Sequence, residues 1–115
     1  VIYGKGGDVS DYVHVQDVVE ATLLALAHDN GDVQVFNVGS GKGYTTYEIA
    51  ERIIQLTGKR VKPIHKPSNH LTKRVVCDIT RANSILGYQP KVELNKGLIE
   101  EINFFSDNPN LWRKT

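Results

Sequence analysis

The chain has 115 residues, the length of one domain, and its 14 basic and 13 acidic residues give a net charge of +1. Because the basic residues look scattered rather than gathered on one stretch, nucleic acid is not an expected partner. The single cysteine, Cys77, cannot form an internal disulfide, and the longest uncharged apolar run, 21–27, is too short to span a bilayer. We therefore expect one cytoplasmic domain, residues 1–115, without a membrane partner.

Residues 11–15 alternate in polarity, which predicts a short strand near the start of the chain. A helix follows it without a loop, because Asp17 and Glu20 match a capping box in front of an apolar run. Gly31 is expected to close this helix.

Residues 33–38, V-Q-V-F-N-V, are rich in β-branched side chains and predict a second strand. The sequence G-S-G-K-G at 39–43 predicts a tight turn after it. Thr45 and Glu48 form a second capping box, which begins a helix with one apolar stripe that Gly58 ends.

The second half of the chain continues the alternation. Two short strands are expected at 61–66 and 72–77, the first at a sheet edge because it contains Pro63. Asp78 or Thr80 caps a brief helix that stops at Gly87. A last helix ends near 108–109, and its apolar face consists of Leu98, Ile99, Ile102 and Phe105. Strands alternating with helices predict an α/β fold with some parallel pairing.

The predicted helix over 18–27 is apolar around its whole circumference, with Glu20 and Thr22 as its only polar residues. A helix that is apolar on every side is normally buried on every side. The short elements of this chain cover one face of it, so we infer a second layer that these residues do not supply. The alternative is a central helix wrapped by the chain's own strands.

The turn at 39–43 lies between a strand and a helix, where a dinucleotide-binding loop would be found. That fingerprint needs a third glycine where Tyr44 stands, and no acidic residue follows about twenty positions later. We therefore reject it as a cofactor loop. A structural turn is the expected role, while phosphate binding by free amides at the helix start stays open.

The histidines and the cysteine show no pattern of a catalytic or metal site. The spacing of His14, His28, His65 and His70 matches no metal motif, and Cys77 lies within an apolar strand pattern that would protect its thiol. His14 is expected to be a hydrogen-bonded structural residue rather than a general base.

Four segments nevertheless form a recognisable series: D-Y-V-H-V-Q-D-V-V, F-N-V-G-S-G, a T-x-x-E helix, and D-I-T-R-A-N-S-I-L-G-Y-Q-P-K-V. In this order and spacing, over about 7–105, they resemble the C-terminal third of the NAD-dependent epimerase/dehydratase family. These are extended short-chain dehydrogenase/reductases that act on nucleotide sugars. The resemblance implies a small mixed α/β domain, the substrate-binding part plus the last strand of the cofactor sheet. It also implies that the apolar helix packs against a large cofactor domain.

The chemistry of that family depends on residues that this sequence lacks. In the family, NAD takes a hydride from a sugar carbon while a tyrosine, four residues before a lysine, takes the hydroxyl proton. No Y-x-x-x-K and no G-x-x-G-x-x-G occurs here. We therefore expect no catalytic, cofactor-binding or metal-binding residue in the chain, no NAD binding, and no activity in isolation.

The resemblance does imply residues of a substrate site. The family has an arginine before its D-Y, reaching the nucleotide diphosphate, and Ser10 stands at that position. A second family arginine corresponds most closely to Lys66, with Lys73 and Arg74 nearby. These three are the candidate substrate-binding residues, although a lysine lacks the bidentate fork of arginine. The alternative is that they are solvated strand ends.

Two hypotheses remain open. The first is that the chain is the substrate-side portion of a nucleotide-sugar epimerase or dehydratase, either a fragment or a truncated gene product, since it starts at Val1 and contains no methionine. Its partner is then the missing N-terminal cofactor domain. The second is a non-catalytic domain that stands alone and dimerises with a second copy through its apolar helix.

Overall fold

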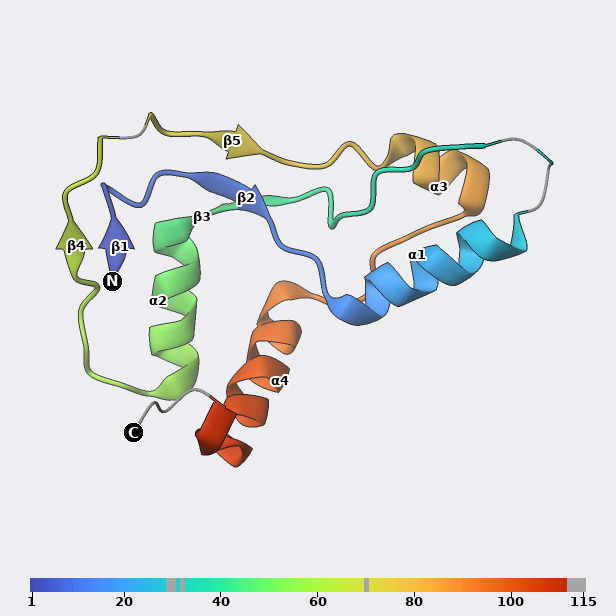
Figure 1. Cartoon of the computed structure of the whole chain (residues 1–115). Helices are drawn as coiled ribbons and strands as arrows, with labels where there is room; N and C mark the ends of the chain where they lie inside the picture. The colour runs from blue at the N-terminus through green and yellow to red at the C-terminus, as the bar shows by residue number, and fades with distance from the viewer. Residues whose placement is uncertain (29–30, 32, 70, 112–115) are drawn as a thin grey trace.

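The computed structural model describes residues 1–28, 31, 33–69 and 71–111, and every structural statement below refers to these residues. The chain forms short strands and helices in alternation, in a body of 52 × 36 × 25 Å (Figure 1). In chain order the elements are β1 Ile2–Tyr3, β2 Val9–Asp11, α1 Val15–Ala27, β3 Gly43–Thr45, α2 Thr46–Thr57, β4 His65–Lys66, β5 Arg74–Val75, α3 Thr80–Leu86, α4 Leu94–Asp107 and the 3-10 turn η1 Pro109–Leu111.

The strands form two small sheets. In the larger one, β2 lies between β3, which is antiparallel to it, and β5, which is parallel to it. In the smaller one, β1 pairs in parallel with β4. The strand predicted at 11–15 is wrong in its bounds, because pairing with β3 and β5 fixes the strand two residues earlier.

Helix α1 begins differently from its prediction. His14 is its N-cap, and the His14 side chain accepts a hydrogen bond from the amide of Gln16. Asp17 is therefore not the cap, because its carboxylate is buried and accepts hydrogen bonds from the amides of Lys91 and Val92 at 2.9 and 3.1 Å. The helix ends at Ala27, ahead of the predicted Gly31.

Helix α2 follows its prediction. The Thr45 hydroxyl accepts from the Glu48 amide and the Glu48 carboxylate accepts from the Thr45 amide, which is a complete capping box. Gly58 ends the helix in the left-handed conformation, with φ 63°. A residue with a side chain is strained in that conformation, so the glycine is the stop signal.

No strand forms over 33–38, which corrects the prediction. Val33 is fully exposed and Val35 is largely exposed, while Phe36 and Val38 pack against the small core. The segment has the alternation of a half-buried strand. It lacks a partner strand among the described residues, so the β pattern is present without the sheet that would complete it.

The remaining predicted elements are present but shorter. Strands β4 and β5 each hold two residues, and Pro63 precedes β4 rather than lying in it. Ile79 occupies the N-cap of α3, although hydrogen bonds from Thr80 to Asp78 lower the pKa of that carboxyl. The predicted stop of α3 at Gly87 is confirmed, and α4 ends at Asp107 as expected.

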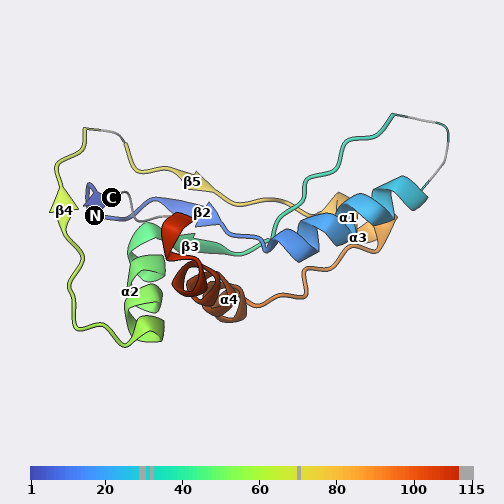
Figure 2. The same cartoon turned by 60° about the horizontal axis from the view of Figure 1, so that its bottom comes forward.

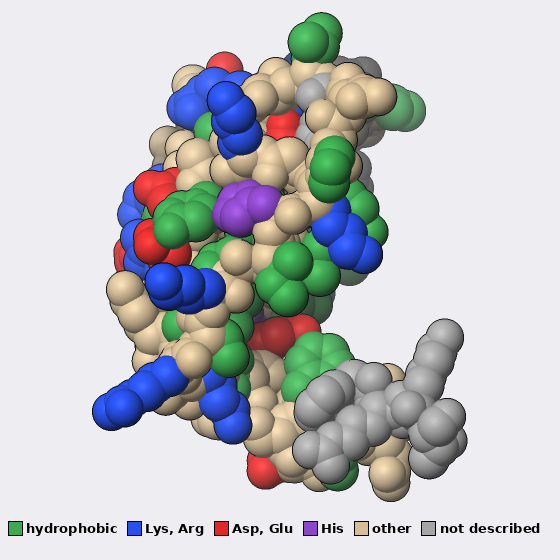
Figure 3. All heavy atoms as spheres, turned by 90° about the vertical axis from the view of Figure 1, so that its left-hand side faces the viewer, with side chains coloured by type: hydrophobic (Ala, Val, Ile, Leu, Met, Phe, Trp, Pro, Cys, Tyr) green, Lys and Arg blue, Asp and Glu red, His purple; other side chains and the backbone are tan. Residues whose placement is uncertain are grey.

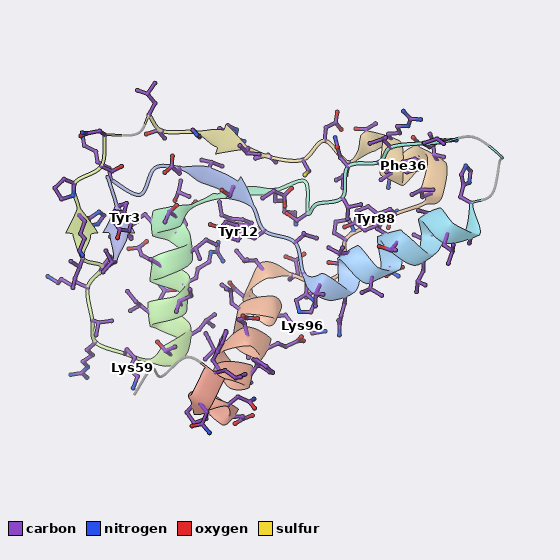
Figure 4. All side chains as sticks on the ribbon, in the orientation of Figure 1. Tyr3, Tyr12, Phe36, Lys59, Tyr88 and Lys96 are labelled. Atoms are coloured by element: carbon purple, nitrogen blue, oxygen red, sulfur yellow. The ribbon has the colours of Figure 1, made fainter. Side chains whose placement is uncertain are left out.

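The buried core is small and lies between α1 and α3. It consists of Ala21, Ala82, Leu86 and Tyr88, with Phe36 beside it. Both views place α1 beside α3 at one end of the molecule, and α2 beside α4 toward the other (Figure 2). Figure 4 shows Phe36 and Tyr88 at the α1–α3 end.

The opposite face of α1 is exposed apolar surface. Within α1, only Asp17 and Ala21 are buried. The apolar residues that remain largely exposed are Val15, Val19, Leu23 and Leu26, spaced as one stripe along the helix. A central helix wrapped by the chain's own strands is therefore wrong.

Candidate functional site

The G-S-G-K-G turn is held by a carboxylate from the chain itself. Asp11, at the end of β2, accepts hydrogen bonds from the amides of Ser40 and Gly41 at 2.8 and 2.9 Å, and from the Ser40 hydroxyl. It also accepts from the amide of Cys77 at 3.2 Å. One side chain thus ties together three segments that are far apart in sequence.

This arrangement removes the phosphate-binding hypothesis for the turn. Asp11 occupies two of the turn's amides, and the amide of Lys42 donates to the Ser40 hydroxyl. The first amides of α2 are also bonded within the chain, to Asp8, Gly6 and Thr45. An anion-binding helix start needs free N–H groups, and these donors already have acceptors.

One face of the larger sheet carries a hollow of about 410 Å³. Its lining residues are Asp8, Val9, Ser10, Thr46, Lys73 and Val75. Lys73 approaches from the β5 side, and its backbone amide donates to the Asp8 carboxylate at 2.8 Å. The polar side chains that line the hollow around β2 are thus two hydroxyl residues, one lysine and the Asp8 carboxylate.

Arg74 lies on the opposite face of the same sheet, because successive strand residues point to opposite faces. Its guanidinium Nη1 lies 3.7 Å from the point where a Cβ on Gly43 would stand. That Cβ would also come within 2.6 Å of Val9 and Val76, so only glycine fits here. Lys73 and Arg74, although adjacent in sequence, therefore face different sides.

Lys66 belongs to a different sheet from the other two candidates. It lies in β4 and pairs with Tyr3 of β1, and its carbonyl accepts from the amide of Gly4 at 2.8 Å. Figure 4 shows Tyr3 at that sheet and Tyr12 near the middle of the molecule, just after β2. The structure thus does not gather the three predicted residues in one hollow; of the three, Lys73 lines the hollow at Ser10.

His14 has structural contacts on both ring nitrogens. Nδ1 accepts from the Gln16 amide, and Nε2 lies 3.2 Å from the carboxylate of Glu100 on α4. The imidazole also packs on Gly97, where a Cβ would approach its ring to 3.1 Å. His14 is thus hydrogen-bonded, as expected, and it joins α1 to α4.

Two further polar side chains serve the fold. The Tyr88 hydroxyl is buried and donates to the carbonyl of Gly39 at 2.8 Å, and burial raises the pKa of this phenol. Cys77 lies outside β5, in contrast to its predicted place in a strand. Its side chain is half-buried, with Sγ 3.7 Å from the Val38 carbonyl oxygen.

Among the described residues, no group of His, Cys, Asp or Glu side chains could hold a metal ion, and no helix is long and apolar enough to cross a membrane.

The sequence comparisons now identify the family. The model of the NAD dependent epimerase/dehydratase family matches residues 1–39. A UDP-glucose 4-epimerase of Mycolicibacterium smegmatis is 39% identical over 105 residues, which cover 90% of this chain and 33% of that protein. The chain belongs to the NAD-dependent epimerase/dehydratase family. It spans about a third of the length of the curated relatives it matches.

Solved structures of family members share the fold. A UDP-glucose 4-epimerase of Thermotoga maritima, solved with UDP-glucose, gives a TM-score of 0.83 at 38% identity, covering 94% of this chain and 35% of that one. A dTDP-glucose 4,6-dehydratase of Bacillus anthracis, solved with NAD, gives 0.81 at 27% identity, covering 96% and 35%. The predicted mixed α/β class, as part of an extended short-chain dehydrogenase/reductase, is confirmed.

The sequence pattern does not reveal the two aspartates that connect distant segments of this fold. It predicts Asp11 as the start of a strand and Asp17 as a helix cap, yet both accept hydrogen bonds from backbone amides of distant segments. The available signal was the spacing D-Y-V-H-V-Q-D, in which each acid stands at the edge of an apolar pattern. A carboxylate at such a position needs a partner when it is buried.

Proposed function

We propose that this chain is the substrate-side portion of an NAD-dependent nucleotide-sugar epimerase or dehydratase. The observation that carries the proposal is its likeness, over 94% of its length, to a third of an epimerase solved with UDP-glucose. The hollow at Ser10 and Lys73 supports it, because an ammonium and two hydroxyls suit a diphosphate oxygen, while the Asp8 carboxylate in the same lining already accepts from the Lys73 amide. Substrate and activity are thus carried over from relatives that are about three times as long.

The residues of this chain do not fit NAD. The dinucleotide would need a glycine loop with free amides, and the amides of Ser40 and Gly41 bond Asp11 instead. The sequence also lacks the Tyr-x-x-x-Lys pair. We therefore assign neither hydride transfer nor proton transfer to this chain.

The contribution of this chain is to bind and orient the nucleotide sugar. Lys73 supplies a point charge at the hollow, next to the Ser10 hydroxyl on the central strand. An exposed ammonium attracts a diphosphate but does not fix its orientation as an arginine fork does, so binding should weaken with salt. Lys66 and Arg74 remain candidates for parts of the ligand that extend beyond the hollow.

The test is a titration of the isotope-labelled chain with UDP-glucose, followed by amide chemical shifts. We expect the largest shifts at Ser10, Thr46 and Lys73, and weaker binding in Lys73→Gln. Lys96→Gln is the control, because it removes the same single charge from α4, away from the hollow. Shifts confined to other surfaces would contradict the site, and an NAD dissociation constant in the low micromolar range by calorimetry would contradict the cofactor assignment.

A second candidate function rests on the exposed stripe of α1. Four large aliphatic side chains along one helix, each more than half exposed, form an apolar stripe of the kind found at protein interaction sites. A stand-alone, non-catalytic domain would cover it with a second copy of itself. Sedimentation separates the candidates: a monomer at high micromolar concentration disfavours this one.

A further inference from the structure

The charges of this chain are strongly segregated, contrary to the even scatter expected from composition. Residues 52–77 contain seven of the 14 basic residues and none of the 13 acidic ones. This stretch therefore carries +7 and the rest of the chain −6, which a net charge of +1 conceals. Such an asymmetry points to an anionic partner for one side of the molecule.

Four of these cations lie close together in sequence on one side of the structure. We call Lys59, Arg60, Lys62 and Lys66 the basic edge; they follow the end of α2 and continue into β4, at the left of Figure 1. All four side chains are exposed. Arg52 and Arg74 are not included, because Arg52 bonds Asn95 and packs on Tyr44, and Arg74 lies over the sheet.

Exposed aliphatic side chains lie among these cations. Ile64 is 63% exposed and Leu71 is 84% exposed, and Val61 is exposed between Arg60 and Lys62. Figure 3 faces this side of the molecule and shows Lys and Arg side chains interleaved with hydrophobic ones, with some Asp and Glu side chains beside them. A surface that combines both kinds of side chain suits a partner that is anionic at its surface and apolar beneath it.

We propose that the basic edge docks on an anionic lipid surface, which reverses the expectation from the sequence of a chain without a membrane partner. The lysines and the arginine attract the charged headgroups, and Ile64 and Leu71 enter the boundary between headgroups and acyl chains. A cluster of four cations is the smallest that such recognition commonly uses. The proposal does not depend on the nucleotide-sugar site, because Lys59, Arg60 and Lys62 lie outside the hollow at Ser10.

Single-stranded nucleic acid fits this surface less well, because it needs open aromatic faces beside the cations. Of the aromatic rings here, Tyr47 and His65 stack on each other with centroids 6.1 Å apart, and Tyr3, paired with Lys66 across the smaller sheet, is 61% exposed. A single open ring does not provide the series of stacking faces that successive bases need. Glu51 lies in the adjoining groove with them, where its hydrogen bond raises the pKa of Tyr47. The Glu51 carboxylate in this groove repels phosphates. The aliphatic side chains of Ile64 and Leu71 offer no aromatic face on which a nucleotide base could stack.

The experiment is co-sedimentation of the 115-residue chain with vesicles. Phosphatidylcholine vesicles that contain phosphatidylglycerol should bind it, and pure phosphatidylcholine should not. Binding should fall when salt is raised from about 0.1 M to about 1 M, because the Debye length falls from roughly 10 Å to 3 Å. The variant Lys59→Gln/Lys62→Gln should weaken partitioning by roughly thirtyfold, which corresponds to about 1 kcal/mol per cation near the membrane.

The matched control is Lys42→Gln/Lys96→Gln, which removes two exposed lysines elsewhere and should bind as the parent does. Ile64→Ser should weaken binding at constant charge, while Leu26→Ser on α1 should not. Equal binding to neutral vesicles, or greater loss in either control, overturns the proposal. So does binding of an oligonucleotide that depends on Lys59 and Lys62 without any binding of vesicles.

Discussion

Helices α1 and α2 have nearly equal lengths, 13 and 12 residues, but they are built for different surroundings. Helix α2 carries its own start and stop signals, a capping box at Thr45 and a left-handed Gly58, and one apolar stripe. Helix α1 has only the His14 ring as an N-cap, and most of its apolar side chains face outward.

The difference teaches that the sequence can define where a helix forms even when the rest of the chain leaves much of that helix exposed, as it does for α1. Helix α2 depends on local signals, so its stability should respond to changes within it. Helix α1 depends on distant contacts, of which the buried one is the Asp17 carboxylate accepting from the amides of Lys91 and Val92, and on a small core. Four predictions separate these two modes.

The largest effect should come from Asp17→Ala. This change leaves the amides of Lys91 and Val92 without acceptors in a part-buried position, and each such loss costs about 1–3 kcal/mol. We expect the free energy of unfolding to fall by about 3 kcal/mol or more, measured by urea denaturation. Glu20→Ala is the control on the same helix, because it removes only an exposed ion pair to Lys91. Equal effects of the two variants would contradict the anchoring role of Asp17.

The next effect separates the two faces of α1. Leu24 packs against the core, so Leu24→Ala should cost about 2 kcal/mol, while Leu23→Ala on the exposed face should cost less than about 0.5 kcal/mol. Urea denaturation below the association range measures both. Leu23→Glu should also abolish any self-association seen by sedimentation without unfolding the chain. If Leu23→Glu unfolds the monomer, the exposed face of α1 has been misassigned.

A smaller effect is expected at the start of α2. Thr45→Ala removes one half of the capping box and should cost about 1 kcal/mol of unfolding free energy. Thr45→Ser keeps the hydroxyl and serves as the control, with a loss of a few tenths at most. If Thr45→Ala is neutral by thermal denaturation, α2 depends on tertiary packing as α1 does, and the contrast between the helices disappears.

The smallest effect concerns pH and the same capping box. Hydrogen bonds from the backbone and side chain of Thr45 lower the pKa of Glu48 below its ordinary value of 4.5. The ionised form is therefore favoured by folding, so its stabilising effect is complete above the ordinary pKa and is lost as pH falls through the lower folded value. Carbon-detected titration of the Glu48 carboxyl should show the lowered pKa. Thr45→Ala removes the side-chain hydrogen bond but keeps the larger contribution of the backbone amide, so it should return the midpoint only part of the way toward 4.5. A midpoint of 4.5 or above in the unmodified chain would contradict the cap as the cause.

The features of the fold that the sequence predicts are those encoded locally. The capping box at Thr45 and Glu48 and the glycine stops at Gly58 and Gly87 need only a few adjacent residues, and all three are confirmed. The failures are non-local. The helix start at Asp17 was misjudged because an acid before an apolar run matches a cap equally well, whether its carboxylate bonds its own helix or a distant loop. The strand at 33–38 failed because a β pattern says nothing about where the partner strand is.

The candidate site was predictable only in part, for a related reason. The sequence pointed to Lys66, Lys73 and Arg74 as one group, but strand alternation and sheet membership separate them. Two residues that are adjacent in a strand point to opposite faces of the sheet. Which of them shares a face with Ser10 is decided by the pairing register of β5 with β2. The segregation of charge along 52–77 needed no structure, only a count by segment instead of over the whole chain.

The position of β2 in the middle of its sheet also sets an order of events in time. Both partners of β2 lie downstream, β3 at Gly43–Thr45 and β5 at Arg74–Val75. During synthesis at about 5–20 residues per second, Arg74 is made roughly 3 to 13 seconds after Asp11. During that interval β2 has no β5 to pair with, so at least one of its two edges is unpaired. This sheet therefore cannot be completed until β5 has been made, well after the strand at its centre.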